Sequence, residues 1–336
     1  MAITTADLKW FYASNRDKTT PSRNGGRPTG IQISNNVEGN IWPSVTSAQR
    51  KSGVVQAEKV FAKNTNANNE SGMNPWMALS IPNKTDEYEY VVMADQDGFQ
   101  SDLTGNERRY TASALAEAVQ IGATQVKITL DEPSLVDCYQ VGDDIVIYNS
   151  GLSLANTSCV YEFAKISNVS ASGTTVTLQL DGPGLEHAFA LNNGIVTGII
   201  KFPYEFGARV DNIVQSGTGQ YDFDDSPLEL DNIGTIRQNW TITYNGDGTV
   251  DVTGDDQGSL GDFPTINDIA PVNTQFSKPY FTLAARGHGQ SHVAGDTIKF
   301  NTYASVLPLW WFKVVPQNCG SIPMTSSKIV AMTETG

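Results

Sequence analysis

Dense glycine and proline punctuation is the feature that most constrains the fold of this chain. Thirty glycines and fifteen prolines divide its 336 residues into short segments. Four segments are rich in the β-branched and aromatic residues that favour strands: Val126–Leu130, Asp144–Tyr148, Thr174–Leu180 and Trp240–Tyr244. The third alternates Val176, Leu178 and Leu180 with polar residues, which predicts one face on a core and the other in water. We therefore expect a mainly β protein of antiparallel β-sandwich and barrel domains with one or two short helices.

The sequence offers one helical window, Thr111–Gln120, in which Ala, Leu and Glu dominate. Its length suits a single connecting helix. A parallel α/β fold needs a crossover helix between successive strands, and the chain has no such series of windows. The pattern argues against that fold class.

Three regions differ in composition. Residues 1–110 are polar and rich in asparagine, and we expect an N-terminal assembly segment that is part of the main β domain, with a surface loop at Asn64–Gly72 and a bend at Asn24–Gly30. Residues 122–198 predict a small inserted β-barrel or roll, in which Tyr161–Ile166 returns beside Asp144–Tyr148. Residues 199–336 predict the C-terminal part of the main β domain.

The length and the cysteines bound the class of protein. A chain of 336 residues can bury a core without disulfides. Cys138, Cys159 and Cys319 are odd in number and far apart, which argues against a secreted disulfide framework and a zinc ribbon and indicates a reduced, cytosolic site of assembly. Charged residues interrupt the N-terminus and no run of eighteen apolar residues occurs, so we expect neither a secretion signal nor a membrane partner.

The charge of the chain argues against binding to nucleic acid. Its 22 basic and 36 acidic residues give a net charge of −14, the wrong sign for holding a phosphate backbone. We therefore expect no specific contact with nucleic acid. The same sign suits passive contact with DNA that slides through a lumen.

The three histidines show no catalytic or metal-binding arrangement. His288 and His292 are four residues apart, a spacing that on a helix could present two nitrogens to zinc. The flanking glycines oppose a helix, and the glutamate of a metalloprotease motif is missing, so a polar turn is favoured over a metal site. His187 follows a predicted strand with no nearby serine or cysteine to activate, and we expect a surface or packing role.

The acidic residues gather in two stretches that resemble turns more than ligand sets. The register of a calcium-binding EF-hand loop is absent, although a calcium site stays open as an alternative. Asn245–Gly248 lies between two predicted strands and favours a hairpin turn. A pair of glycosidase carboxylates need not be adjacent in sequence, so this alternative also stays open. The stretches contain Asp222, Asp224, Asp225, Asp247, Asp251, Asp255, Asp256 and Asp262.

The aromatic run Leu309–Phe312 has two interpretations. Exposed, Trp310 or Trp311 would form a platform for a sugar or a partner; buried, both would belong to the core of a sheet, which strand aromatics favour. In a strand, Trp310 and Phe312 share one face while Trp311 and Lys313 share the other. No phosphate loop, nucleophile elbow or activated cysteine is present, so we predict no enzyme and no catalytic, cofactor-binding or metal-binding residues.

Several short motifs, in a particular order, resemble one family of proteins. The N-terminal ones are Gly25-Gly26-Arg27 with Gly30, Asn40-Ile41-Trp42-Pro43 and Lys59-Val60-Phe61. The C-terminal ones are a strand beginning at Trp240, Pro271-Val272-Asn273, Pro279-Tyr280-Phe281, Phe300-Asn301-Thr302 and Pro308-Leu309-Trp310. This order is similar to that of virion structural, tail-associated proteins of tailed bacteriophages, of the siphophage and Mu-like groups. Pro28 stands where the family has methionine, and Gly287–His292 replaces a tryptophan-containing glycine loop.

The resemblance implies a non-enzymatic structural role in the virion, assembled in the host cytoplasm. We expect a tail component, in the tail tube or at the tip or baseplate, that forms rings around the DNA channel. The implied partners are copies of the chain itself, in a ring or stack, and other tail proteins. Three alternatives stay open: a capsid or neck protein, a carbohydrate-binding module, and a hydrolase with dispersed carboxylates.

Overall fold

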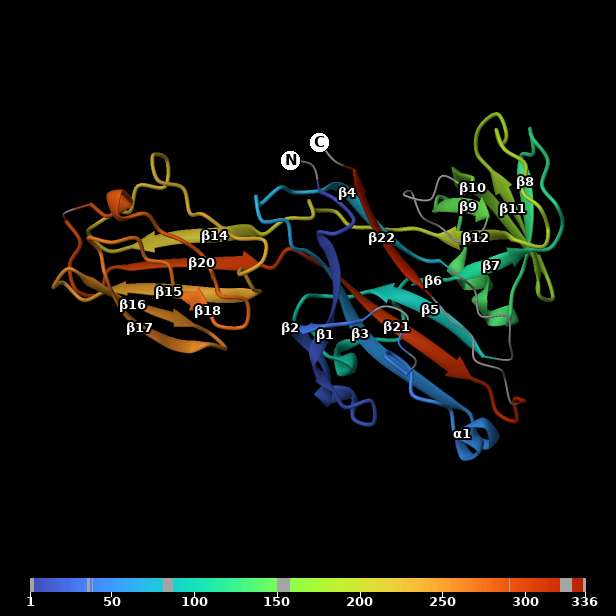
Figure 1. Ribbon diagram of the computed structural model, residues 1–336, viewed down its shortest axis with the longest axis horizontal. Coiled ribbons are helices and arrows are strands. Elements are labelled where there is room, and N and C mark those ends of the chain that lie inside the picture. The colour runs from blue at the N-terminus through green and yellow to red at the C-terminus, as the bar shows by residue number, and fades with distance from the viewer. Residues whose placement is uncertain are drawn as a thin grey trace.

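The protein is an elongated row of three lobes (Figure 1). The computed structural model describes residues 3–34, 37, 39–80, 87–149, 158–289, 291–320 and 328–334. A central lobe lies between a barrel (residues 112–198) and a five-stranded lobe (residues 209–303). The mainly β, antiparallel fold is confirmed, and the described part of the chain has one α-helix, α1 (Ser47–Ser52). Four 3-10 turns complete the helical content: η1 (Pro21–Arg23), η2 (Gln100–Asp102), η3 (Pro133–Cys138) and η4 (Ala285–Gly287).

The central lobe is a β-sandwich of two sheets. Its six-stranded sheet has the order β2-β1-β3-β21-β5-β6, and its three-stranded sheet has the order β13-β4-β22. Apolar side chains from both sheets, such as Val60 on β3 and Met77 on β4, share one core. The strands are β1 (Leu8–Arg16), β2 (Asn24–Gln32), β3 (Val54–Asn64), β4 (Met73–Leu79), β5 (Tyr88–Met93), β6 (Arg109–Tyr110), β13 (Ile200–Lys201), β21 (Val306–Val315) and β22 (Ile329–Glu334).

Strand β21 brings the C-terminal aromatic run into the middle of the six-stranded sheet, between β3 and β5. The predicted alternation along this strand is confirmed. Trp310 and Phe312 pack together on one face of the sheet, and Trp311 packs in the core of the sandwich on the other. The aromatic side chains are therefore buried on both faces of the sheet.

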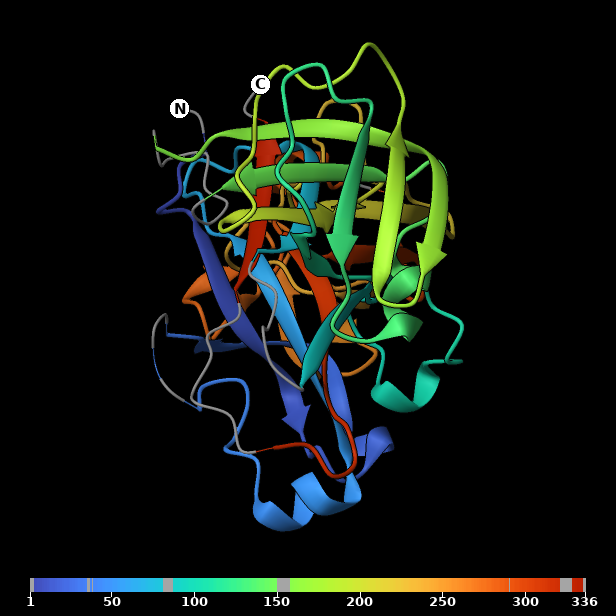
Figure 2. The ribbon, with the colours of Figure 1, turned by 90° about the vertical axis from the view of Figure 1, so that its right-hand side faces the viewer.

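The barrel is closed, with the strand order β10-β11-β8-β7-β12-β9 (Figure 2). The predicted strands at 126–130, 144–148 and 174–180 are confirmed, and residues 161–166 return antiparallel to β9. Val176, Leu178 and Leu180 point into the barrel core, as their alternation predicts. The strands are β7 (Ala112–Leu115), β8 (Gln125–Thr129), β9 (Asp144–Asn149), β10 (Tyr161–Ser172), β11 (Thr175–Leu180) and β12 (Gly194–Gly198).

The predicted helix at Thr111–Gln120 is wrong. The window instead begins with strand β7, which pairs with β8 and β12, and continues to an isolated bridge between Val119 and Phe189. Leu115 and Val119 are buried in the barrel core. Closing the barrel satisfies the backbone of this segment and buries its apolar side chains, which outweighs the helix propensity of Ala, Leu and Glu.

The five-stranded lobe is a second insert in the central lobe. Its sheet has the order β14-β20-β15-β16-β17, and loops together with a two-stranded sheet of β18 and β19 cover one face, where Trp240 and Phe281 lie in the core. The range 199–336 is thus divided between this lobe and strands β13, β21 and β22 of the central lobe. The strands are β14 (Arg209–Ser216), β15 (Gln238–Tyr244), β16 (Thr249–Gly254), β17 (Gly258–Pro264), β18 (Val272–Asn273), β19 (Lys278–Pro279) and β20 (Thr297–Tyr303).

The N-terminal segment is more regular than its composition predicts. The bend expected at Asn24–Gly30 is wrong: the segment belongs to β2, whose pairing with β1 is irregular at two places. The loop at Asn64–Gly72 is anchored, because the amide of the buried Asn64 donates to the carbonyls of Glu70 and Phe206, both at 2.8 Å. Among the described residues, no helix is both long and apolar enough to cross a membrane.

Candidate functional site

Residues from both ends of the chain meet where β2 crosses the loop around Gly98. Gly25 has a φ of +121°, and a Cβ at this position would lie 2.7 Å from the Gly98 carbonyl oxygen and 3.0 Å from the Trp310 ring. The Gly26 amide donates to the same carbonyl at 3.0 Å. Only glycine combines this backbone conformation with such a close approach. The N-terminal Gly-Gly-Arg motif and the C-terminal Pro-Leu-Trp motif therefore form one contact.

Lys59 adds a buried charge to this contact. The residue is fully buried, and its Nζ donates to the Gly98 carbonyl oxygen at 2.7 Å. The Nζ also lies 5.3 Å and 5.7 Å from the ring centroids of Phe61 and Trp310. Burial lowers the pKa of Lys59 from 10.5 to about 8, although nearby aspartates, Asp97 foremost, act in the opposite direction. The Lys59 amine thus stabilises the loop around Gly98 through this hydrogen bond.

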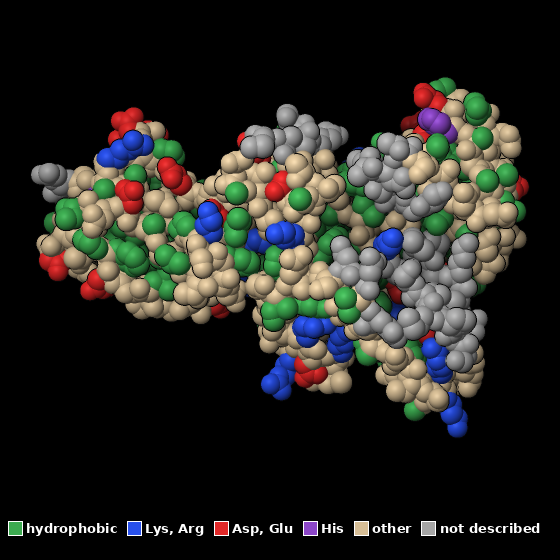
Figure 3. All heavy atoms as spheres, in the orientation of Figure 1, with side chains coloured by type: hydrophobic (Ala, Val, Ile, Leu, Met, Phe, Trp, Pro, Cys, Tyr) green, Lys and Arg blue, Asp and Glu red, His purple; other side chains and the backbone are tan. Residues whose placement is uncertain are grey.

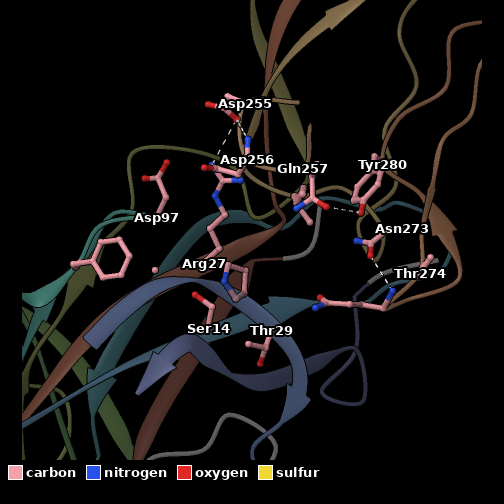
Figure 4. A pocket seen from close by; sticks show the side chains of 15 residues that line it. Ser14, Arg27, Thr29, Asp97, Asp255, Asp256, Gln257, Asn273, Thr274 and Tyr280 are labelled. Atoms are coloured by element: carbon pink, nitrogen blue, oxygen red, sulfur yellow. Dashed lines mark hydrogen bonds and ion pairs between the residues drawn. The ribbon is translucent and has the colours of Figure 1, made fainter. Parts of the chain in front are cut away.

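A cleft of about 660 Å³ lies beside this contact, between β2 and the five-stranded lobe (Figure 4). The Arg27 guanidinium extends across it, pairs with Asp256 and donates to the side-chain oxygen of Gln238. Asp255 lies 3.9 Å from the same guanidinium. The residues that line the cleft include Ser14, Thr29, Asp97, Phe99, Asn273 and Tyr280.

Two further cations tie the five-stranded lobe to the central lobe. Arg237 of the five-stranded lobe reaches Asp97 at 3.4 Å. Lys63 of the central lobe is almost fully buried and donates from Nζ to the Ile233 carbonyl oxygen at 2.7 Å. Burial lowers its pKa from 10.5 to about 7. We call the set Arg27, Lys63 and Arg237, with the partners named here, the lobe junction.

Residues of the C-terminal motifs shape the far wall of the junction. The Asn273 amide donates to the Gly234 carbonyl at 2.8 Å, and the Tyr280 hydroxyl donates to Gln257 at 3.2 Å. Trp240 packs on Tyr280 and Phe281 with ring centroids 5.2 Å and 5.1 Å apart. Arg27, Asn273 and Tyr280, each from a different sequence motif, thus lie around one inter-lobe contact.

The sugar-stacking interpretation of the aromatic run is wrong. Trp310 is 2% exposed and Trp311 is 6% exposed, so neither ring offers a platform. The Trp311 indole donates to the buried carboxylate of Glu89 at 2.8 Å and packs edge-on against Trp42. Trp42 belongs to the Asn-Ile-Trp-Pro motif, which therefore also has a packing role.

The segment that carries His288 and His292 is irregular. His288 directly follows η4 and forms an isolated β-bridge with Tyr221, and the described residues between His288 and His292 are not helical. Within the part of the chain that the structure describes, no three His, Cys, Asp or Glu side chains are grouped as a metal site. His187 is half exposed on the barrel, with its Nδ1 3.3 Å from Glu162.

The acidic stretches form turns, a strand pair and part of the cleft. Asp222 accepts from the amides of Asp224 and Asp225 at 3.0 Å, and Asp247 accepts from the Thr249 amide in the predicted hairpin between β15 and β16. Asp251 on β16 lies opposite Asp262 on β17, and a side-chain hydrogen bond between the two carboxyls raises the pKa of Asp262. Asp255 and Asp256 line the cleft beside Arg27. The sequence did not reveal this last role, because the partner is more than 200 residues away.

Cys138, Cys159 and Cys319 are free thiols. Cys138 is buried, and burial raises the pKa of its thiol to about 12, which disfavours the reactive thiolate. Cys159 is buried as well. These thiols pack as small apolar side chains.

The buried charges of the central lobe have structural partners. Glu58 is fully buried and pairs with Arg16 and with Lys18, the latter at 2.7 Å. Glu87 pairs with Arg50 at 2.8 Å and Lys313 at 2.6 Å. Such groups fix the strands on which they lie, since breaking a buried pair costs about 3–5 kcal/mol. Sequence reasoning missed them because lysine and glutamate are usually surface residues.

Comparison with known proteins gives no relative. No protein-family model, no curated protein and no solved structure matches the chain.

Proposed function

We propose that the protein is a non-enzymatic structural component of a tailed-phage virion, namely a tail protein of the tube or of the tip or baseplate. The observation that carries the proposal is the position of the family-like motifs. Gly25, Lys59 and Trp310 meet at one contact, and Arg27 extends from it to the five-stranded lobe. If these motifs are shared because they maintain the fold and not because they perform chemistry, they should occupy such packing positions.

The distribution of charge supports assembly with other copies. Residues 209–303 hold 13 acidic and 5 basic side chains, and residues 112–198 hold 9 and 2. All other residues together hold 14 acidic and 15 basic side chains. Figure 3 shows red side chains over the five-stranded lobe and the tip of the barrel, and most blue ones on the central lobe. An acidic lobe of one copy can therefore approach the near-neutral central lobe of the next, where Arg23 and Lys51 are exposed.

A head-to-tail contact of this kind is heterologous, and it closes into a ring when the rotation between copies allows it. The partners are then other copies of this chain and neighbouring tail proteins. A ring whose lumen is lined by the acidic lobes would let DNA pass without adsorbing it. No membrane and no sequence-specific DNA contact is part of the proposal.

Mass spectrometry of purified particles, combined with immunogold labelling, tests the proposal. We expect the protein in gradient-purified virions at a copy number that matches a ring, with gold particles on the tail. Labelling at the capsid or neck would support the alternative structural position. Absence of the protein from purified virions would contradict a structural role in the particle.

A further inference from the structure

A pair of histidines is enclosed at one end of the five-stranded lobe, away from the lobe junction. Residues 285–289 and 291–296, which we call the strap, include both His288 and His292. The His292 ring stacks on the Tyr244 ring with centroids 3.7 Å apart and an interplanar angle of 6°. The Tyr244 hydroxyl and the His288 Nδ1 are 2.7 Å apart. Two imidazoles thus hold the strap against the end of β15.

The imidazoles are enclosed without a full set of polar partners. The His292 side chain is 7% exposed, and within the described residues neither of its ring nitrogens has a hydrogen bond. The His288 Nε2 is buried and also has none. A neutral imidazole leaves at most one N–H donor without a partner, because its other nitrogen carries no proton. A protonated imidazole would bury a charge and an unpaired N–H donor.

The neighbouring charges do not compensate. Asp296 lies 3.7 Å from the His292 Nδ1, but its carboxylate already accepts from the amides of Thr218, Gly219 and Val293 at 2.8–3.0 Å. The exposed Asp268 faces His288 from the loop after β17. Tyr221 and Tyr244 complete the surroundings, and burial raises the pKa of both, so they stay neutral. The two histidines also face each other, with ring centroids 6.4 Å apart.

The strap is anchored near both ends. The Ala285 amide donates to Asp268 at 2.8 Å, and the Gly287 carbonyl accepts from the Asp222 amide at 2.9 Å. At the other end, the Gly295 amide donates to the Tyr244 carbonyl at 2.9 Å. The two histidine rings lie between these anchors, so their release would open the middle of the strap while its ends stay bonded.

We propose that the strap is an acid-sensitive latch, closed while His288 and His292 are neutral and released when they take up protons. Release would expose the rings of Tyr221 and Tyr244 at the end of the lobe. This inference does not depend on the proposed function.

The direction of the effect follows from proton linkage. Burial lowers the pKa of His288 from 6.5 to about 4 and also lowers the pKa of His292, while the released strap restores ordinary values. Between about pH 6.5 and pH 4 the released form binds more protons, so its population rises as the pH falls. His288 alone changes the opening equilibrium by about 30-fold between pH 7.5 and pH 5.

Hydrogen–deuterium exchange of the full chain tests the latch. After correction for the pH dependence of chemical exchange, strap peptides should open about 30-fold more at pH 5 than at pH 7.5. His288→Phe/His292→Phe keeps two rings without ionisable nitrogens and should remove the difference. His187→Phe, on the surface of the barrel, should retain it. An equal pH response in the wild type and the double variant would overturn the proposal.

Ring-proton NMR of the wild type gives a second test that does not require the double variant to fold. We expect two of the three histidines to stay neutral below pH 6 and to titrate only as strap amides lose protection. Titration of His288 and His292 near pH 6.5 without loss of strap protection would refute the latch.

Discussion

At the scale of single residues, the fold depends on charged side chains that are buried, although the burial of a charge costs solvation free energy. Lys59 and Lys63 are buried on β3, and so is Glu58, which directly precedes Lys59. Each has a specific partner, and the partners come from distant parts of the chain. These residues fix which elements meet, because a buried polar group without its partner is costly.

Lys59 should give the protein an unusual dependence on pH. Its pKa is about 8 when folded and 10.5 when unfolded, so the unfolded chain binds more protons between these values and stability rises with pH there. Between pH 7.5 and pH 10, the free energy of unfolding of the wild type should rise by about 2 kcal/mol relative to Lys59→Met. Urea denaturation at both pH values measures this, and Lys51→Met, at an exposed site, should follow the wild type. Parallel profiles for wild type and Lys59→Met would contradict the assignment.

Substitution of Gly25 should destabilise the protein far more than substitution of another glycine with a positive φ. Gly25→Ala combines a φ of +121° with clashes against Gly98 and Trp310, and we expect a loss of about 3 kcal/mol. Gly105→Ala, at a φ of +84° with no atom within 4 Å, isolates the backbone cost of about 1 kcal/mol. Thermal and chemical unfolding of both variants provide the comparison. Equal losses would show that the close approach to Trp310 does not matter.

At the scale of elements, strands with clear alternation of polar and apolar residues could be predicted from sequence. The strand in the window 111–120 could not, because the composition of this window favours a helix. The alternation of Val176, Leu178 and Leu180 determines which face is buried wherever a core exists. Residues 111–120 have helical composition, but their conformation depends on strands up to 85 residues away that close the barrel. The bulged strand β2 was hidden for a related reason, since its glycines serve a close approach to Gly98 rather than a bend.

The candidate site could not be predicted from the sequence, because its residues are far apart along the chain. Arg27 belongs to the Gly-Gly-Arg motif and Asp256 to an acidic stretch, but nothing local in the sequence links them. The sequence shows the order of the motifs, whereas the contact of Arg27 with Asp256 depends on the fold.

The barrel should fold as an independent element. Its two ends are paired, with Thr197 opposite Ala112 and the Gly198 amide donating to the Thr111 carbonyl at 3.2 Å. Its core consists of its own residues, with Tyr88 and Tyr90 at the margin. A fragment of residues 110–199 should therefore show cooperative thermal unfolding by circular dichroism. In it, Leu178→Ala should cost about 2–5 kcal/mol and the exposed Thr175→Ala less than about 0.5 kcal/mol. A fragment without a cooperative transition would show that the central lobe is required.

At the scale of the whole molecule, association between copies should depend on salt. Contact between an acidic lobe and the central lobe is screened as ionic strength rises, so complexes seen by mass photometry in about 50 mM salt should dissociate in about 500 mM. Arg23→Glu/Lys51→Glu should weaken association in low salt because both residues are exposed on the central lobe. Lys299→Glu makes the same kind of substitution, with half the charge change, at an exposed site on the five-stranded lobe and should not weaken association. If neither added salt nor the double substitution weakens association, the electrostatic contact is excluded.

Electron microscopy of the purified protein at high concentration tests the central proposal most directly. Assembly of this chain into a tail component predicts closed rings or short stacked tubes with a central channel, and two-dimensional averages with a single rotational symmetry. The three-lobed outline of one copy should recur around each ring. Particles that remain single three-lobed monomers at every concentration would contradict the proposed role.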